Sequence, residues 1–324
     1  MAKKSSQLAH ELFDIYSANF HIHASKYKDL VACPLCFERF SRSAIDSGEL
    51  TVEHIIPEKI GGRLTTLSCK KCNNHHGSAL DSHLVRRFQA EDKLLGKGNK
   101  PLRGKIYVGD GEFTADIRIL RGADRDLMIN TTSLPQSSDP KLKKLADDRI
   151  GDDLINIMRG RSVKIKFELG FIELASQVAA LRSSYLMMFY YFGYGYIKHK
   201  ALEQVRFQIW NPELNTKVLK GIQILDTTSP DKNGVSIITN PIAMQCFFVT
   251  LNFSTELDRY WGVALPGLDS SGYTLYEGLN FSGKDARVEI ETCPRHEKFL
   301  VDPEYARIAE HFWNESINKK RTPN

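Results

Sequence analysis

Runs of apolar residues with two different periods divide the chain into helical and extended segments. Four apolar residues near the N-terminus recur at helical spacing: Leu8, Leu12, Ile15 and Tyr16. This spacing predicts an amphipathic helix over residues 6–20. An apolar stretch at residues 172–192 predicts a buried helix, and residues 306–317 predict a third helix, followed by a basic tail.

Short runs rich in β-branched and aromatic residues, separated by Gly, Pro, Asp and Asn, predict strands. Residues 105–108 and 113–120 flank Gly109-Asp110-Gly111 and predict a hairpin. Residues 133–143 contain two prolines and read as a loop. Other expected strands are residues 50–52, 163–169, 222–225, 235–239, 245–251, 260–265, 273–276 and 288–290.

A long uncharged run lies in the predicted helix and its continuation, residues 183–197. Its 15 residues fall short of the about 18 needed to cross a bilayer. Its aromatic side chains could stack on bases, but core packing is the better interpretation. The chain shows no N-terminal apolar segment of the secretory type. We therefore expect a cytoplasmic protein without a membrane partner.

The pattern predicts an α+β fold in two domains. The 324 residues are 42% hydrophobic, which is enough for a sizeable core. A Gly-, Lys- and Pro-containing stretch at residues 96–101 reads as a linker. We expect a small domain at residues 1–100 and a larger mixed α+β domain at residues 101–324, which contains no motif or repeat that indicates its role.

Two C-x2-C motifs form the strongest chemical signal in the sequence. Their cysteines are Cys33, Cys36, Cys69 and Cys72. Two such turns can supply the closed tetrahedral thiolate shell that structural Zn²⁺ prefers. A closed shell leaves no open coordination position, so this metal would hold the fold together and take no part in a reaction. Disulfides or buried free thiols are the alternatives, although paired C-x2-C spacing favours metal.

Between the two motifs lies Glu53-His54, directly after the predicted strand 50–52 and shortly before Pro57. Neighbouring residues on a strand point to opposite faces, so the two side chains would need a bend to share one site. The alternative is a structural histidine beside a solvated glutamate.

The order Cys33-x2-Cys36, Glu53-His54-x2-Pro57, Gly61-Gly62, Cys69-x2-Cys72-Asn73 resembles the zinc-knuckle branch of the HNH, or ββα-metal, endonucleases. The resemblance covers about residues 30–84. It implies two strands and a helix around one divalent cation, with Glu53 and Asn73 as ligands of Mg²⁺ or Mn²⁺ and His54 as the general base. Such roles are chemically consistent, because a neutral imidazole can deprotonate water near pH 7 and a hard cation stabilises the developing charge on a phosphate.

The sequence departs from the family at one position. Many members carry an asparagine in the loop before the third cysteine that orients the base, but residues 63–68 contain none. Thr65, Thr66 or a backbone carbonyl could replace it. Asn74, His76 and Asp81 lie in or near a helix expected to start at about Asn73, where they could support the site or act only as surface or capping residues.

Positive charge is concentrated near the motif. Residues 1–105 contain 17 Lys+Arg and 11 Asp+Glu, a formal +6, whereas the remainder carries −1. The expected phosphate contacts are Lys70, Lys71, Arg86 and Arg87. A basic face of this kind fits DNA, with RNA not excluded, although a merely solvated face is the alternative. We expect a fragment ending near Lys105 to keep much of the DNA binding.

These observations favour a metal-dependent DNA endonuclease, such as a phage-defence or mobile-element effector. The alternative is a catalytically inactive, zinc-dependent nucleic-acid-binding module. A third hypothesis is a nuclease that stays silent until a protein partner or small ligand binds residues 101–324.

Overall fold

The computed structural model describes residues 2–98, 100–108, 111–121, 127–133, 163–225, 233–268, 275–276 and 288–318. Their contacts divide the chain into two compact units. Unit 1 comprises residues 1–84, 172–254 and 258–324, and unit 2 comprises residues 85–171 and 255–257. The expected boundary at residue 100 falls inside unit 2, and the C-x2-C motifs share unit 1 with the C-terminal half of the chain. Separate folding of residues 1–100 stays a prediction.

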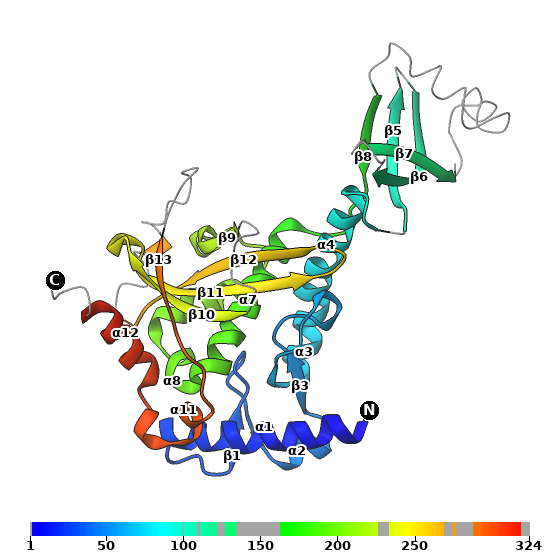
Figure 1. Cartoon of the computed structure of the whole chain (residues 1–324). Coiled ribbons are helices and arrows are strands. Elements are labelled where there is room, and N and C mark those ends of the chain that lie inside the picture. Colours follow the sequence, from blue (N-terminus) through cyan, green and yellow to red (C-terminus); the bar gives the residue numbers. More distant parts are fainter. Residues whose placement is uncertain are drawn as a thin grey trace. The chain divides into compact units, whose positions relative to one another are not determined.

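The N-terminal part of unit 1 builds the motif region from a long helix and two short antiparallel ribbons (Figure 1). Its elements are α1 (Ala2–His23), β1 (Leu30–Ala32), β2 (Arg39–Ser41), α2 (Ser43–Asp46), β3 (Leu50–His54), η1 (Glu58–Ile60), β4 (Thr65–Cys69), α3 (Lys70–His76), the π-helical turn η2 (Gly77–Asp81) and α4 (Ser82–Leu94), which continues into unit 2. β1 pairs with β2, and β3 pairs with β4. One zinc-knuckle turn lies in the first ribbon, and the Glu53-His54 pair lies in the second.

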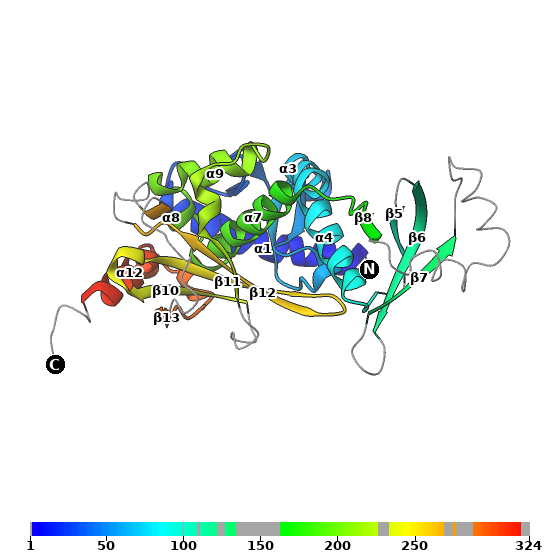
Figure 2. The ribbon, with the colours of Figure 1, turned by 90° about the horizontal axis from the view of Figure 1, so that it is seen from above.

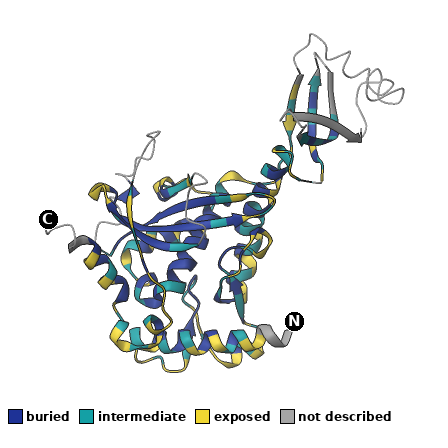
Figure 3. Ribbon diagram, viewed as in Figure 1, coloured by how far each residue is buried: buried dark blue, intermediate teal, exposed yellow. Residues whose placement is uncertain are grey.

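The C-terminal part of unit 1 is a five-stranded antiparallel sheet with helices packed on it. The strand order is β13-β10-β11-β12-β9, from β9 (Ile222–Leu225), β10 (Gly234–Asn240), β11 (Cys246–Ser254), β12 (Asp258–Leu265) and β13 (Glu289–Thr292). The helix α7 (Glu173–Phe192) packs against the three central strands of this sheet (Figures 1 and 2). α7 and the central strands are almost wholly buried, so the core of unit 1 lies between them (Figure 3).

The remaining elements of unit 1 are short. They are α8 (Tyr194–Ile197), η3 (Lys200–Leu202), α9 (Glu203–Trp210), η4 (Lys217–Gly221), η5 (Ile242–Met244), α11 (Lys298–Val301), η6 (Pro303–Tyr305) and α12 (Ile308–Asn318). Aromatic rings connect α7 to both sides of the unit, because Phe189 stacks on Tyr16 of α1 at 4.4 Å and Phe192 contacts Phe247 of β11 at 5.7 Å.

Unit 2 contains a four-stranded antiparallel sheet of its own. The order is β7-β6-β5-β8, from β5 (Leu102–Val108), β6 (Gly111–Arg121), β7 (Leu127–Ser133) and β8 (Val163–Phe167). The predicted hairpin of β5 and β6 is confirmed, with Val108 paired to Gly111.

The α+β fold class and the three predicted helices are confirmed, and the predicted strands agree with the structure apart from 273–276. That segment lies partly outside the described residues, and Leu275 and Tyr276 are helical. The loop expected at 133–143 also lies outside them, except for Ser133 at the end of β7. Two local expectations were wrong: most of the expected loop at residues 63–68 belongs to strand β4, and the motif helix starts at Lys70 rather than at about Asn73. None of the described helices is long and apolar enough to cross a membrane.

Candidate functional site

Four cysteine sulfurs converge where the β1–β2 turn meets the junction of β4 and α3. One sulfur from each of Cys33, Cys36, Cys69 and Cys72 lies within 4.8 Å of the others. Backbone N–H groups point at the same place, since Cys69 N donates to Cys33 Sγ and Cys72 N donates to Cys69 Sγ, both at 3.4 Å. Hydrogen bonds from neighbouring cysteines, chiefly Cys33, lower the pKa of Cys36 and of Cys69. Four converging cysteine sulfurs match the donor set of a closed structural zinc site.

The first knuckle is held by aromatic side chains from the C-terminal half of unit 1. The Tyr185 hydroxyl of α7 donates to Pro34 O at 2.9 Å, and Trp210 Nε1 of α9 donates to Leu35 O at 3.1 Å. The Tyr194 hydroxyl of α8 accepts from Ala32 N at 2.9 Å and donates to Ala32 O at 2.5 Å. The knuckle backbone is therefore fixed by residues more than 150 positions away.

Glu53 and His54 end strand β3 with opposite exposures. Glu53 is buried at 4% exposure, whereas His54 is half-buried and pairs in register with Thr65. This alternation agrees with the strand geometry expected from the sequence. Thr65, a candidate substitute for the missing asparagine, is thus the cross-strand neighbour of His54.

Glu53 belongs to a buried charge cluster that the sequence motif does not reveal. Arg182 of α7 is fully buried, and its Nη2 donates to Glu53 Oε1 while its Nη1 lies 3.1 Å from Asp81 Oδ2. Ser68 Oγ donates to Glu53 Oε2 at 3.4 Å. Burial by itself lowers the pKa of Arg182, but the Asp81 and Glu53 carboxylates outweigh this effect and raise it. Arg182 therefore remains a cation shared between two carboxylates.

Asp81 occupies the outer side of this cluster, in the π-helical turn. Burial raises the pKa of Asp81 to about 6, against the opposing effect of Arg182 and with a further increase from Glu53. Its contacts make Asp81 an ion-pair partner of α7 rather than a helix cap or surface residue.

Asn73, in α3, lies beside the outer part of β3. Its Nδ2 donates to Thr51 Oγ1 at 3.1 Å. Thr51 and Glu53 are two positions apart on β3 and point to the same face. The structure thus brings Asn73 to the face of β3 that carries Glu53, and Asn73 Oδ1 is not used in this hydrogen bond.

The other predicted helix residues differ in exposure. Asn74 is exposed, whereas His76 is completely buried and packs edge-on against Trp210 at 4.8 Å between ring centroids. Burial, with a smaller contribution from Arg182, lowers the pKa of His76 to about 3. Neither ring nitrogen of His76 has a hydrogen-bond partner in the described part of the chain. A neutral imidazole enclosed in this way does not face solvent.

The four predicted phosphate contacts also differ in exposure. Lys70, Lys71 and Arg86 are exposed. Arg87 is buried and forms an ion pair with Glu91 at 2.8 Å between Nε and Oε1, one helical turn later. A phosphate contact therefore suits the first three better than Arg87.

The Gly-Gly pair forms the tight connection between β3 and β4. Gly61 has a φ of +90°, which glycine adopts without strain. At Gly62, an added Cβ would lie 1.7 Å from Ile56 O, so the backbone leaves no room for a side chain. This turn returns the chain from Glu53-His54 to the second knuckle.

Residues 31–89 match the family model described as HNH endonuclease. The chain contains an HNH endonuclease domain. No curated protein and no solved structure matches the chain. The family match covers the zinc-knuckle cysteines, β3, β4, α3 and the first part of α4, and it leaves the rest of the chain without a counterpart.

The donor types in the HNH domain suit a hard divalent cation, because Glu53 and Asn73 offer carboxylate and amide oxygens. Asn73 Oδ1 fits this role directly. Glu53 fits it less simply, since its two oxygens already accept from Arg182 and Ser68, although a carboxylate has about four lone-pair sites.

Sequence reasoning missed the residues outside the motif that complete this region. Arg182, Tyr185, Tyr194 and Trp210 lie in helices that the pattern of apolar residues marks only as core or does not predict. Arg182 had one weak signal: it is the only charge between Glu173 and Lys198. A single arginine in such an apolar stretch usually needs a buried partner.

Proposed function

We propose that this protein is a metal-dependent HNH endonuclease that hydrolyses phosphodiester bonds of DNA. The observation that carries the proposal is the sulfur cluster within the matched segment, which joins the end of β4, the strand paired with Glu53-His54, to the start of the Asn73 helix. This arrangement holds a candidate base and two oxygen donors on adjoining elements.

In this proposal His54 acts as the general base. Its half-buried side chain at the end of β3 can reach solvent and take a proton from the attacking water. Thr65, opposite His54 in the hairpin, is the proposed substitute for the missing asparagine. Lys70, Lys71 and Arg86 hold the phosphate backbone.

Glu53 and Asn73 are the proposed ligands of one Mg²⁺ or Mn²⁺ ion. When bound, such an ion supplies charge stabilisation at the phosphate and the leaving oxygen. Ser68 orients the Glu53 carboxylate, and Thr51 orients the Asn73 amide. A cytoplasmic role in phage defence or in a mobile element, with control by a protein or small ligand through residues 101–324, completes the proposal.

The direct test compares wild type with His54→Ala on plasmid DNA in the presence of Mg²⁺ or Mn²⁺. Cleavage by the variant should fall by about 10²-fold or more, because positioned acid–base catalysis contributes about 10² to 10⁴. His311→Ala is the matched control, since His311 is an exposed histidine in α12. Zinc content and DNA binding should match in all three proteins. Equal cleavage by wild type and His54→Ala would exclude His54 as the base.

One observation favours the second candidate, an inactive nucleic-acid-binding module. Glu53 is buried, and its oxygens accept hydrogen bonds from Arg182 and Ser68. In an inactive module, the Arg182 guanidinium would permanently take the place of the divalent cation. In that case wild type would bind nucleic acid but cleave neither DNA nor RNA with any divalent cation.

A further inference from the structure

An exposed apolar stripe lies on α9, outside the segment that matches the HNH family. Phe207, Trp210 and Leu214 are 53%, 37% and 41% exposed. Phe207 and Trp210 are three residues apart, which places them on one side of α9. Leu214 lies in the segment that follows the helix, four residues after its last residue, Trp210. The opposite side is buried through Val205 and Ile209. Exposed apolar side chains that form a contiguous patch rimmed by polar residues mark binding surfaces.

The stripe continues onto the HNH domain. The His75 ring of α3 stacks on Trp210 with centroids 5.6 Å apart and an interplanar angle of 17°. Lys71 is four residues before His75, on the same side of α3. The aromatic surface thus begins beside one of the proposed phosphate contacts and extends along α9.

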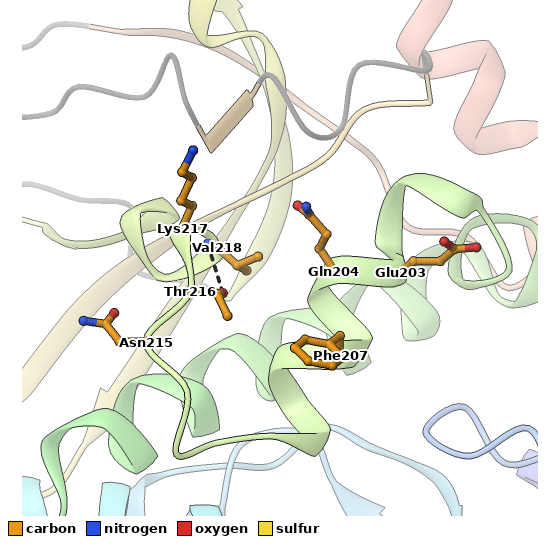
Figure 4. Close-up of a pocket in the computed structure, with 7 residues that line it drawn as sticks. All are labelled: Glu203, Gln204, Phe207, Asn215, Thr216, Lys217 and Val218. Carbon is orange, nitrogen blue, oxygen red and sulfur yellow. Dashed lines mark hydrogen bonds between the residues drawn. The ribbon is translucent and has the colours of Figure 1, made fainter.

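A pocket of about 650 Å³ lies beside Phe207. Its lining residues are Glu203, Gln204, Phe207, Asn215, Thr216, Lys217 and Val218. Figure 4 shows Gln204 and Phe207 projecting toward the segment 215–218, while Glu203 points away from it. A flat apolar ring beside amide groups is the combination that holds an unpaired base, through stacking on its face and hydrogen bonds to its edge.

The charge of this region selects among possible occupants. Residues 198–220 contain five Lys or Arg and two Glu, a formal +3. A basic segment around exposed aromatic rings complements a polyanion that carries aromatic bases. This charge argues against a basic or apolar peptide.

We propose that Phe207, Trp210 and the adjoining pocket bind unpaired nucleobases of the nucleic acid that the HNH domain engages through Lys70 and Lys71. This inference rests on the proposed function for the identity of the polymer. It assigns the substrate class: DNA or RNA with unpaired bases near the scissile phosphate, such as a single strand, flap or junction.

Tryptophan fluorescence can test the inference selectively. Of the three tryptophans in the sequence, Trp261 and Trp313 are 2% and 3% exposed, so Trp210 is the accessible one. Zinc-loaded full-length protein carrying His54→Ala, which prevents cleavage, is titrated with an oligothymidylate. An abasic oligomer of the same length and phosphate number is titrated in parallel.

We expect the oligothymidylate to quench the fluorescence and to bind at least about tenfold more tightly than the abasic oligomer, in line with base–aromatic stacking energies. Adding Phe207→Ala should remove most of this difference. Adding Ile242→Ala, which removes an even more exposed apolar side chain from η5, should not. Equal affinity for the two oligomers, or a difference that survives Phe207→Ala in zinc-loaded protein, would overturn the inference.

The titration, taken together with the cleavage assay of the wild-type protein, separates this inference from the proposed function. Base-dependent binding by a protein that cleaves no nucleic acid would refute the nuclease and keep the base site. Cleavage of duplex DNA by a protein with no base-dependent binding would keep the nuclease and refute the base site.

Discussion

The Arg182 guanidinium stabilises the carboxylates of Glu53 and Asp81 at a buried position that water does not solvate. The side chains of Arg182 and Glu53 are 0% and 4% exposed, so solvent screens their interaction little. Assembling such a cluster contributes little net stability, because desolvation of the charges offsets their attraction. Breaking the cluster is costly, because it leaves buried charges without a partner.

Removing the shared cation should therefore destabilise the protein strongly. We expect Arg182→Met to lower the free energy of unfolding by about 3–5 kcal/mol, as for other buried ion pairs that lose one partner. Arg182→Lys should retain only part of the stability. The ammonium keeps the positive charge, but it cannot bridge two carboxylates as a guanidinium does. Denaturant unfolding of the zinc-loaded proteins measures both effects.

Arg307→Met is the control for this prediction, because the Arg307 side chain is 84% exposed and pairs only at the surface with Glu310. Its effect should be below about 1 kcal/mol. A similar small effect for Arg182→Met would show that the buried cluster does not hold α7 against the HNH domain.

At the scale of elements, the four-cysteine cluster links short segments that bury little apolar surface of their own. The cysteine cluster connects the β1–β2 turn, the end of β4 and the start of α3. Cys69 also caps α3, since its sulfur accepts from Cys72 N. Loss of the metal would release three elements at once.

Zinc and the proposed Mg²⁺ or Mn²⁺ should consequently respond differently to removal. Mild chelation should stop cleavage reversibly, because hard-cation sites keep exchangeable water ligands. Cys69→Ser should lower the zinc content and melt the HNH domain, since structural zinc binding is largely folding energy. Elemental analysis and thermal unfolding measure these outcomes. Cys246→Ala, at a buried cysteine outside the cluster, should keep its zinc. Purified wild type without zinc would rule out the four-cysteine site.

The sequence predicts elements with strong local patterns and fails where contacts between distant residues decide the structure. The cysteine spacing and the Glu-His-x-x-Pro segment were sufficient to predict the cluster and the HNH domain, because both depend on residues close in sequence. Strand β4 was missed because Thr65–Cys69 lacks a clear alternation, and all but its first residue are buried. The role of Arg182 could not be predicted, since its partners are 101 and 129 residues away.

At the scale of the whole molecule, residues 31–84 of the HNH domain belong to unit 1, together with the C-terminal half of the chain. Charge alone predicted that a fragment ending near Lys105 would keep much of the DNA binding. That fragment would lose Arg182, Tyr185, Tyr194 and Trp210, which hold Glu53 and the first knuckle. Unit 2 contributes none of these four contacts.

A pair of deletions can therefore test which part of the chain the HNH domain requires. We expect residues 1–105 alone to be protease-sensitive and to bind zinc poorly, because the knuckle backbone and Glu53 lose their partners. Replacing residues 85–171 by a short glycine-serine linker should preserve the fold and the zinc of unit 1, with weaker cleavage because the phosphate contact of Arg86 is lost. The linker has a short distance to span, because Ile172 N donates to His83 Nδ1 at 3.1 Å.

Limited proteolysis, zinc content and plasmid cleavage of both proteins measure these outcomes. If the fragment 1–105 folds, holds zinc and binds DNA as the full chain does, while the internal deletion fails to fold, the HNH domain does not depend on α7, α8 and α9.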